Sequence, residues 1–212
     1  MELLRGPGGC PWDAEQTHES IRKDFIEETY EVIEAINKND KELLKEELGD
    51  VLLQVAFHTQ IEKEENGFEF SDVCDGICKK LIERHPHVFG DINVSSTDEV
   101  LTNWDNIKRK SKGQKTQGSS MLKVPKELPA LMRAQKVLKK AIKGGYDATS
   151  DMKNGAASLR ALADAIEVGE IAYNGSLAAD SLLAICAYAQ AAGADSEELL
   201  TKRVNGFIES YK

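Results

Sequence analysis

Two groups of carboxylates lie close together in the first quarter of the sequence, in the segments EETYE and EELGD. In helical conformation, the i, i+3 pairs Glu28/Glu31 and Glu47/Asp50 would each aim two carboxylates at one spot. Four oxygen ligands of this kind, with no histidine or thiol among them, suit Mg²⁺ or Mn²⁺. The spacing therefore indicates a divalent metal site shared by two neighbouring helices.

The pattern around the second group strengthens this interpretation. Taken alone, the first helix would be an ordinary amphipathic helix with a solvated acidic face. The second would be apolar around most of its circumference, which is typical of a buried helix; its apolar residues are Leu48, Val51, Leu52, Leu53, Val55, Ala56 and Phe57. A narrow polar stripe, Glu47, Asp50, Gln54 and His58, remains. Buried carboxylates at close range lose hydration and repel one another, so either their pKa values rise or a cation neutralises them.

Basic and aromatic residues further along the chain could complete such a site. Lys80 and Arg84 are four residues apart and share a face of a third predicted helix, and Lys108 follows Trp104 in the segment WDNIK. Acids that hold a metal next to Lys and Arg are typical of phosphate-handling sites. Each of these cations could also be an ordinary surface charge, and Trp104 could be either a core residue or a platform for a base.

The composition excludes several other classes of function. The chain has a formal net charge of −9 and an isoelectric point of about 5.1, which argues against binding to a nucleic-acid polymer. No apolar run approaches the roughly 20 residues of a membrane span, and the first residues lack the apolar region of a secretory signal. We therefore expect a cytoplasmic protein with no membrane partner.

Helical periodicity dominates the chain and strand signals are weak, so the expected fold class is all-α. Helices are expected at about 15–37, 40–64, 71–85, 100–110, 128–143, 152–168, 176–192 and 196–211. Asn39 or Asp40 is a candidate cap of the second helix, and Pro86 should end the third.

An internal repeat divides the sequence. A shift of 130 residues aligns Glu34-Ala35-Ile36 with Asp164-Ala165-Ile166 and Gly49–Leu53 with Ala179–Leu183. Of the acids in EETYE and EELGD, only Asp50 has an acidic counterpart, Asp180; the others align with Ala157, Ser158, Ala161, Ser176 and Leu177. The repeat predicts tandem helical-bundle domains, 1–112 and 127–212, joined by a linker, 113–126. The second copy is expected to be degenerate, since it cannot assemble the acids.

These motifs match a known family. EETYE followed by EELGD resembles the EExxE…ExxD signature of the MazG family of all-α nucleoside triphosphate pyrophosphohydrolases. The segments GGCPWDAEQTHESI, KKLIERHPHVFGD, WDNIK and LPALMRAQKV also resemble blocks of that family. The resemblance extends from Gly8 to about Asp147, and members with two such domains are common.

The resemblance implies hydrolysis of NTPs or dNTPs to the monophosphate and pyrophosphate with Mg²⁺, with Mn²⁺ as the alternative metal. It implies metal ligands at Glu28, Glu31, Glu47 and Asp50, with Glu27 or Glu31 as a catalytic base. It also implies substrate binding by Lys80, Arg84, Trp104 and Lys108, and a homodimer. Two alternatives stay open: a base-specific relative acting on dUTP, dCTP or phosphoribosyl-ATP, and a regulatory protein that binds nucleotides without turnover.

Overall fold

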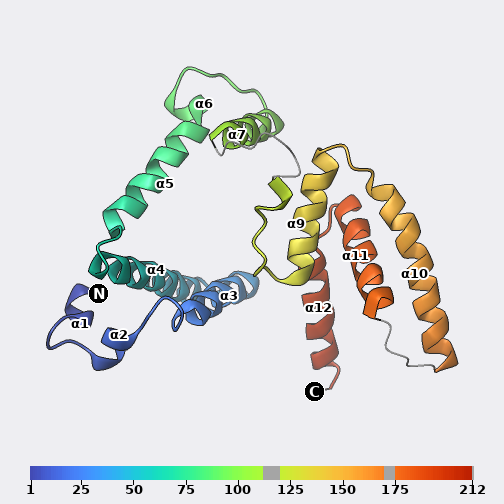
Figure 1. The fold of residues 1–212 in the computed structure, drawn as a ribbon, viewed down its shortest axis with the longest axis horizontal. Coiled ribbons are helices and arrows are strands. Elements are labelled where there is room, and N and C mark those ends of the chain that lie inside the picture. The colour runs from blue at the N-terminus through green and yellow to red at the C-terminus, as the bar shows by residue number, and fades with distance from the viewer. Residues whose placement is uncertain (112–119, 170–174, 212) are drawn as a thin grey trace. The chain divides into compact units, whose positions relative to one another are not determined.

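The computed structural model of the chain describes residues 1–111, 120–169 and 175–211 (Figure 1). Within these ranges the regular structure is helical and no strand is present, which confirms the all-α class. The chain forms two compact units, Met1–Trp104 and Asp105–Lys212. Residues 112–119 of the expected linker lie outside the described residues, and just after them Ser120 and Val124 are buried.

The first unit contains three long helices and several short ones. Its helices are α1 (Glu2–Arg5), α2 (Pro11–Glu15), α3 (Arg22–Lys38), α4 (Lys41–Glu64), α5 (Phe70–Arg84), α6 (Pro86–Phe89) and the start of α7 (Thr97–Ser111). The expected start of the first long helix, Glu15, is wrong. Thr17 and Ser20 exchange hydrogen bonds between backbone N–H groups and side-chain hydroxyls, 2.9 and 3.3 Å long, and this local turn delays the helix to Arg22.

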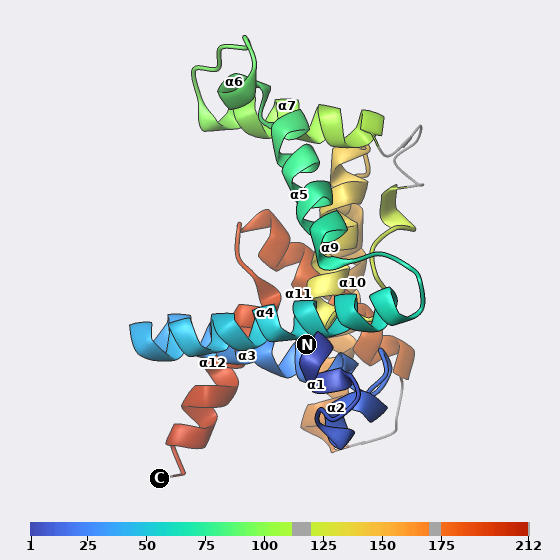
Figure 2. The same ribbon diagram turned by 90° about the vertical axis from the view of Figure 1, so that its left-hand side faces the viewer.

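The hairpin of α3 and α4 is the main element of the first unit, and Figure 2 shows the two helices lying along each other. Asn39 ends α3 in the left-handed conformation (φ 53°), and Asp40 begins α4. The Asp40 carboxylate accepts hydrogen bonds from the backbone N–H groups of Glu42 and Leu43, both 3.1 Å long, so the predicted cap is confirmed. A two-residue connection of this kind makes the two helices antiparallel.

The open end of the hairpin is closed by the N-terminal segment. Ile21, Phe57 and Ile61 form a buried apolar cluster there. The Arg5 side chain, 6% exposed, donates to both carboxylate oxygens of Glu64, with contacts of 2.7 to 3.1 Å. Its Nη1 donates to the Asp13 carbonyl at 2.6 Å. Arg5 therefore fastens the segment before α3 to the end of α4.

The expectation that α4 would be buried on nearly all sides is wrong for the single chain. Leu48, Leu52 and Leu53 are 44 to 57% exposed. Apolar residues are also exposed on α3 (Ile26, Tyr30, Ile33) and on α5 (Val73, Ile77, Leu81). Figure 1 shows the reason: α5 leaves the end of α4 at a steep angle and does not cover the hairpin.

The second unit is built around α9 (Ala130–Lys143), α10 (Ala148–Val168), α11 (Gly175–Ala191) and α12 (Ser196–Glu209). The internal repeat places α10 and α11 at the positions of α3 and α4. These two helices approach so closely that a Cβ added to Gly155 would lie 2.0 Å from the Cβ of Ala184. On its other side, α11 packs on α9 through Leu138, Cys186 and Ala187.

A membrane-spanning helix was not expected from the sequence. Within the described residues, no single helix is long and apolar enough to cross a membrane, and α11 with α12 meets that criterion only as a pair bent by 108°.

Candidate metal-binding site

Three of the predicted acids meet where α3 and α4 face each other. Glu28, Glu47 and Asp50 each contribute one carboxylate oxygen, and these three oxygens lie within 4.8 Å of one another. Glu28 comes from α3 and the other two from α4, because the antiparallel hairpin sets these positions opposite each other. Glu47 is only 8% exposed, although it is charged at neutral pH in water. Hard oxygen ligands clustered in this way are a donor set that suits a divalent metal ion.

The mutual repulsion of these carboxylates favours a bound cation. Burial raises the pKa of Glu28, and the negative charges of Asp50, Glu31 and Glu47 raise it further. Burial likewise raises the pKa of Glu47, followed by the effect of Glu31 and Asp50. Glu31 therefore interacts with the acids on both sides of the hairpin. Within the described part of the chain, no lysine or arginine forms an ion pair with these four residues, so a bound metal ion would relieve the repulsion.

Glu27 is placed differently from the other acids. It is exposed, and it lies about 100° around α3 from Glu28. The structure does not bring its carboxylate into the cluster of Glu28, Glu47 and Asp50. Of the two predicted base candidates, Glu31 is the one in electrostatic contact with the other acids.

The polar stripe of α4 continues beyond the acids. Gln54, one turn after Asp50, is 7% exposed, and its Oε1 is buried without a hydrogen-bond partner among the described residues. One turn further, Nδ1 of His58 lies 2.7 Å from Nδ1 of His18, and the two rings stack. Burial, and then the charge of His18, lower the pKa of His58. His58 therefore pairs with another histidine and is not part of the acid cluster.

The predicted phosphate-binding residues lie away from the acids in a single chain. Lys80 is exposed and Arg84 is partly buried near the far end of α5. At 1.5 Å per residue, Arg84 lies roughly 20 Å along α5 from its start at Phe70, and α5 diverges from the hairpin (Figure 2). The guanidinium carbon of Arg84 lies 5.9 Å from the ring centroid of Trp104. Lys108 is on α7, and its side chain lies outside the described residues.

Two residues that organise this region were missed by sequence reasoning. Arg5 was hidden in a short N-terminal helix that has no apolar periodicity. His18 gave a signal, because it lies ten residues before Glu28 and His58 lies eight residues after Asp50. In an antiparallel hairpin such positions meet, so His18 could have been paired with His58.

Comparison with known proteins adds an independent line of evidence. Residues 16–89 match the model of the MazG nucleotide pyrophosphohydrolase domain. A nucleoside triphosphate pyrophosphohydrolase/pyrophosphatase MazG of Thermotoga maritima is 38% identical over an alignment covering 100% of this chain and 81% of that protein. A nucleoside triphosphate pyrophosphohydrolase of Escherichia coli K12 is 48% identical over 71% of this chain and 57% of that protein.

A further relative is matched over less than half of its own length. A nucleoside triphosphate pyrophosphohydrolase of Mycolicibacterium smegmatis is 43% identical over 70% of this chain and 45% of that protein. The chain thus spans about half the length of the Escherichia coli and Mycolicibacterium relatives, and most of the length of the Thermotoga protein. The domain match covers α3 and α4, where the acid cluster lies.

Proposed function

The chain belongs to the MazG family of nucleotide pyrophosphohydrolases, and from this premise we propose that it hydrolyses nucleoside triphosphates, NTPs or dNTPs, to the monophosphate and pyrophosphate. The observation that carries the proposal is the cluster of Glu28, Glu47 and Asp50, in which Glu47 is buried and the other two are half-buried, together with Glu31. These are the acids of the family signature, and they lie within the matched domain. The second unit would not hydrolyse, because alanine, serine and leucine replace its acids.

The metal would be Mg²⁺, with Mn²⁺ as a substitute. Glu28, Glu31, Glu47 and Asp50 would hold it, since Glu28, Glu47 and Asp50 bring three hard oxygen donors together and Glu31 interacts with Glu28 and Glu47. When bound, such an ion screens the charge of the triphosphate and lowers the pKa of a coordinated water. The raised pKa values of Glu28 and Glu47 fit this assignment, because an ion would replace the protons that burial favours.

A carboxylate near the metal would accept the proton of the attacking water as the P–O bond at the α-phosphorus breaks. Glu31 is better placed for this role than Glu27, because it interacts with Glu28 and Glu47 while Glu27 is exposed. The expelled pyrophosphate carries high negative charge, which Lys80 and Arg84 would match. Trp104 and Lys108 are further candidates for binding the substrate.

We further propose that two copies of the chain share each site. In one copy Lys80 and Arg84 are separated from the acids, and apolar side chains of α3, α4 and α5 are exposed. Leu52 of α4 and Ile77 of α5, for example, are 57% and 46% exposed. Exposed apolar helix faces of this extent are typical of surfaces that bind another protein. A homodimer would cover them and would let α5 of one copy serve the acids of the other.

Pyrophosphate release with Mg²⁺, measured over a panel of NTPs and dNTPs, tests the activity. Glu47→Gln should lower the rate by at least about 100-fold, because it removes a ligand. Glu34→Gln is the matched control, since Glu34 is an exposed acid on α3 that pairs with Lys38. A rate that Glu47→Gln leaves unchanged would refute the site. A strong preference for one base would identify a base-specific enzyme, and tight binding without release of pyrophosphate would identify a nucleotide-binding regulator.

Complementation between variants tests the shared site. Co-expressed chains carrying Glu47→Gln or Arg84→Ala should recover activity that neither variant has, because a mixed dimer contains one intact site. Random pairing predicts about a quarter of the wild-type rate. Absence of any recovery, with mixed dimers demonstrated by differential tags, would contradict sharing between copies while leaving the hydrolysis proposal intact.

A further inference from the structure

The second unit contains a cavity that is separate from the acid cluster. Its volume is about 590 Å³, within the range of roughly 300 to 1,000 Å³ that small-molecule sites occupy. α9 contributes most of its lining, the segment just before α9 contributes three residues, and Tyr146 after α9 and Leu183 on α11 complete it. Met121, Leu138 and Leu183 make its middle part apolar. No carboxylate is among the described residues that line it.

Two cations belong to the lining of this cavity. Lys126 precedes α9 and Arg133 lies on α9. Neither side chain has a hydrogen-bond or ion-pair partner within the described residues. Lysine and arginine heads that converge on a cavity without a neutralising acid favour an anionic ligand, and a guanidinium suits phosphate in particular.

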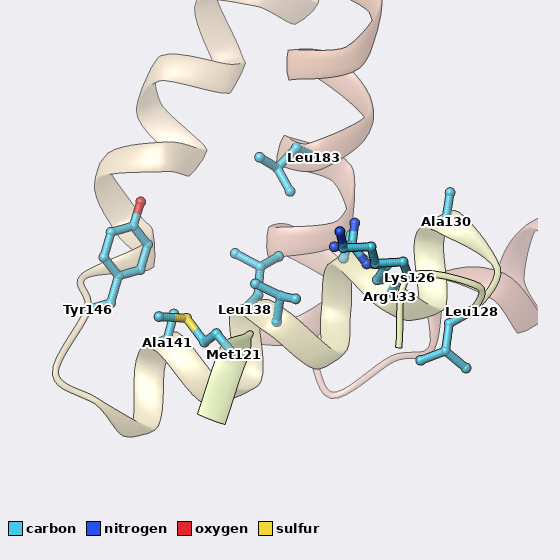
Figure 3. A pocket seen from close by; sticks show the side chains of 11 residues that line it. Met121, Lys126, Leu128, Ala130, Arg133, Leu138, Ala141, Tyr146 and Leu183 are labelled. Carbon is cyan, nitrogen blue, oxygen red and sulfur yellow. The ribbon is translucent and has the colours of Figure 1, made fainter. Parts of the chain in front are cut away.

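The lining differs between the two ends of the cavity. Figure 3 shows the nitrogens of Lys126 and Arg133 over one side, the ring of Tyr146 over the opposite side, and Leu138 and Met121 between them. The cavity therefore has a cationic end, an apolar middle and an aromatic end. A ligand that fits this order carries a charged phosphate at one end and a flat aromatic group at the other.

We propose that this cavity is a second nucleotide-binding site, which holds the phosphates with Lys126 and Arg133 and the base against the apolar and aromatic part. Because no acid is among the described lining residues, binding needs no divalent metal, unlike binding at the acid cluster. The site also lies away from the positions that the repeat aligns with the acids, since Ser158, Ala161 and Leu177 are not part of its lining. The proposal does not depend on hydrolysis in the first unit.

Calorimetric titration of the full chain with ADP in the presence of EDTA tests this site. Without a metal, the acid cluster repels phosphates, so the second site alone should bind. Saturable binding of one ADP per chain is expected. The double variant Lys126→Ala/Arg133→Ala should weaken it by at least about tenfold, whereas Lys136→Ala/Lys139→Ala, which removes two exposed cations of α9 outside the cavity, should not.

Further probes identify what the cavity recognises. Ala130→Trp, which adds a large ring at an exposed lining position, should block ADP without removing a charge. Adenosine and inorganic phosphate should each bind at least about tenfold more weakly than ADP, because each lacks one half of the ligand. The proposal is overturned if ADP does not bind, or if the Lys126/Arg133 double variant binds it like the wild type. Phosphate binding as tight as that of ADP would also overturn it, because the cavity would then recognise the anion alone.

Discussion

A carboxylate oxygen of Glu28 on α3 lies within 4.8 Å of one of Glu47 on α4, and no lysine or arginine of the described residues is paired with either acid. This contact means that the fold keeps two negative charges close together in a sheltered position. The cluster therefore lowers stability in the absence of a cation and provides affinity in its presence.

Metal binding should stabilise the wild-type chain through this contact. Added Mg²⁺ should raise the melting temperature of the wild type, because the ion binds the folded acids and not the unfolded chain. In EDTA, Glu47→Gln should melt roughly a few degrees higher than the wild type, because it removes a repelled charge. The increase in melting temperature that Mg²⁺ causes should also be much smaller in Glu47→Gln than in the wild type. Thermal melts of Glu34→Gln, which should behave like the wild type in both conditions, provide the control.

The same contact predicts a pH dependence. Burial raises the pKa values of Glu28 and Glu47 in the folded state above the ordinary carboxyl value of 4.5. The folded state thus binds more protons than the unfolded state just above pH 4.5, so this contribution to stability is present at lower pH and is lost as the pH rises. The stability gain from Glu47→Gln in EDTA should therefore grow from pH 4.5 toward 7, as followed by denaturant unfolding. A gain that stays constant over this window would contradict the raised pKa of Glu47.

Arg5 should be a main determinant of the stability of the N-terminal segment. Its side chain is 6% exposed, and Arg5→Ala would remove contacts to Glu64 and to the Asp13 carbonyl together. We expect a loss of about 2 kcal/mol, below the value for a fully buried pair because Glu64 is partly solvated. Lys63→Ala removes the exposed pair with Glu2 and should cost less than about 0.5 kcal/mol. Equal losses for the two variants in urea unfolding would refute the role of Arg5.

Gln54 offers a test of a buried polar group. Because its Oε1 has no hydrogen-bond partner among the described residues, Gln54→Met should be neutral or stabilise the apo chain by up to about 1 kcal/mol. Gln60 lies on the same helix and donates a hydrogen bond to Glu64 at 3.0 Å. Gln60→Met should therefore change the free energy of unfolding in the opposite direction. A clear destabilisation by Gln54→Met would show that the amide has a partner in solution.

The close approach of α10 and α11 depends on Gly155. Gly155→Ala would place a Cβ 2.0 Å from that of Ala184, so the helices must separate, at a cost of about 1 to 3 kcal/mol. Gly206 on α12 has no atom within 4 Å of the corresponding position, so Gly206→Ala should instead stabilise by up to about 1 kcal/mol. Denaturant unfolding of both variants distinguishes the steric cost of a side chain at Gly155 from the gain in helix propensity that alanine brings at Gly206.

The long helices were predictable because each carries an apolar periodicity or a capping residue of its own. Asp40, which caps α4, and Pro86, which ends α5 and opens α6, act through neighbouring backbone groups alone. The short helices α1 and α2 were not predictable, since a few residues cannot show a period. The late start of α3 was missed because it depends on the hydrogen bonds between Thr17 and Ser20.

The sequence by itself determined that Glu28, Glu31, Glu47 and Asp50 belong to two neighbouring helices, because helical spacing and a short turn are local properties. Only the tertiary structure decided that Glu27 stays outside the cluster, that Arg5 and His18 support the hairpin, and that α5 holds Lys80 and Arg84 away from the acids. It also revealed the cavity lined by Arg133. These features depend on the packing direction of segments far apart in the chain, which no local pattern of residues contains.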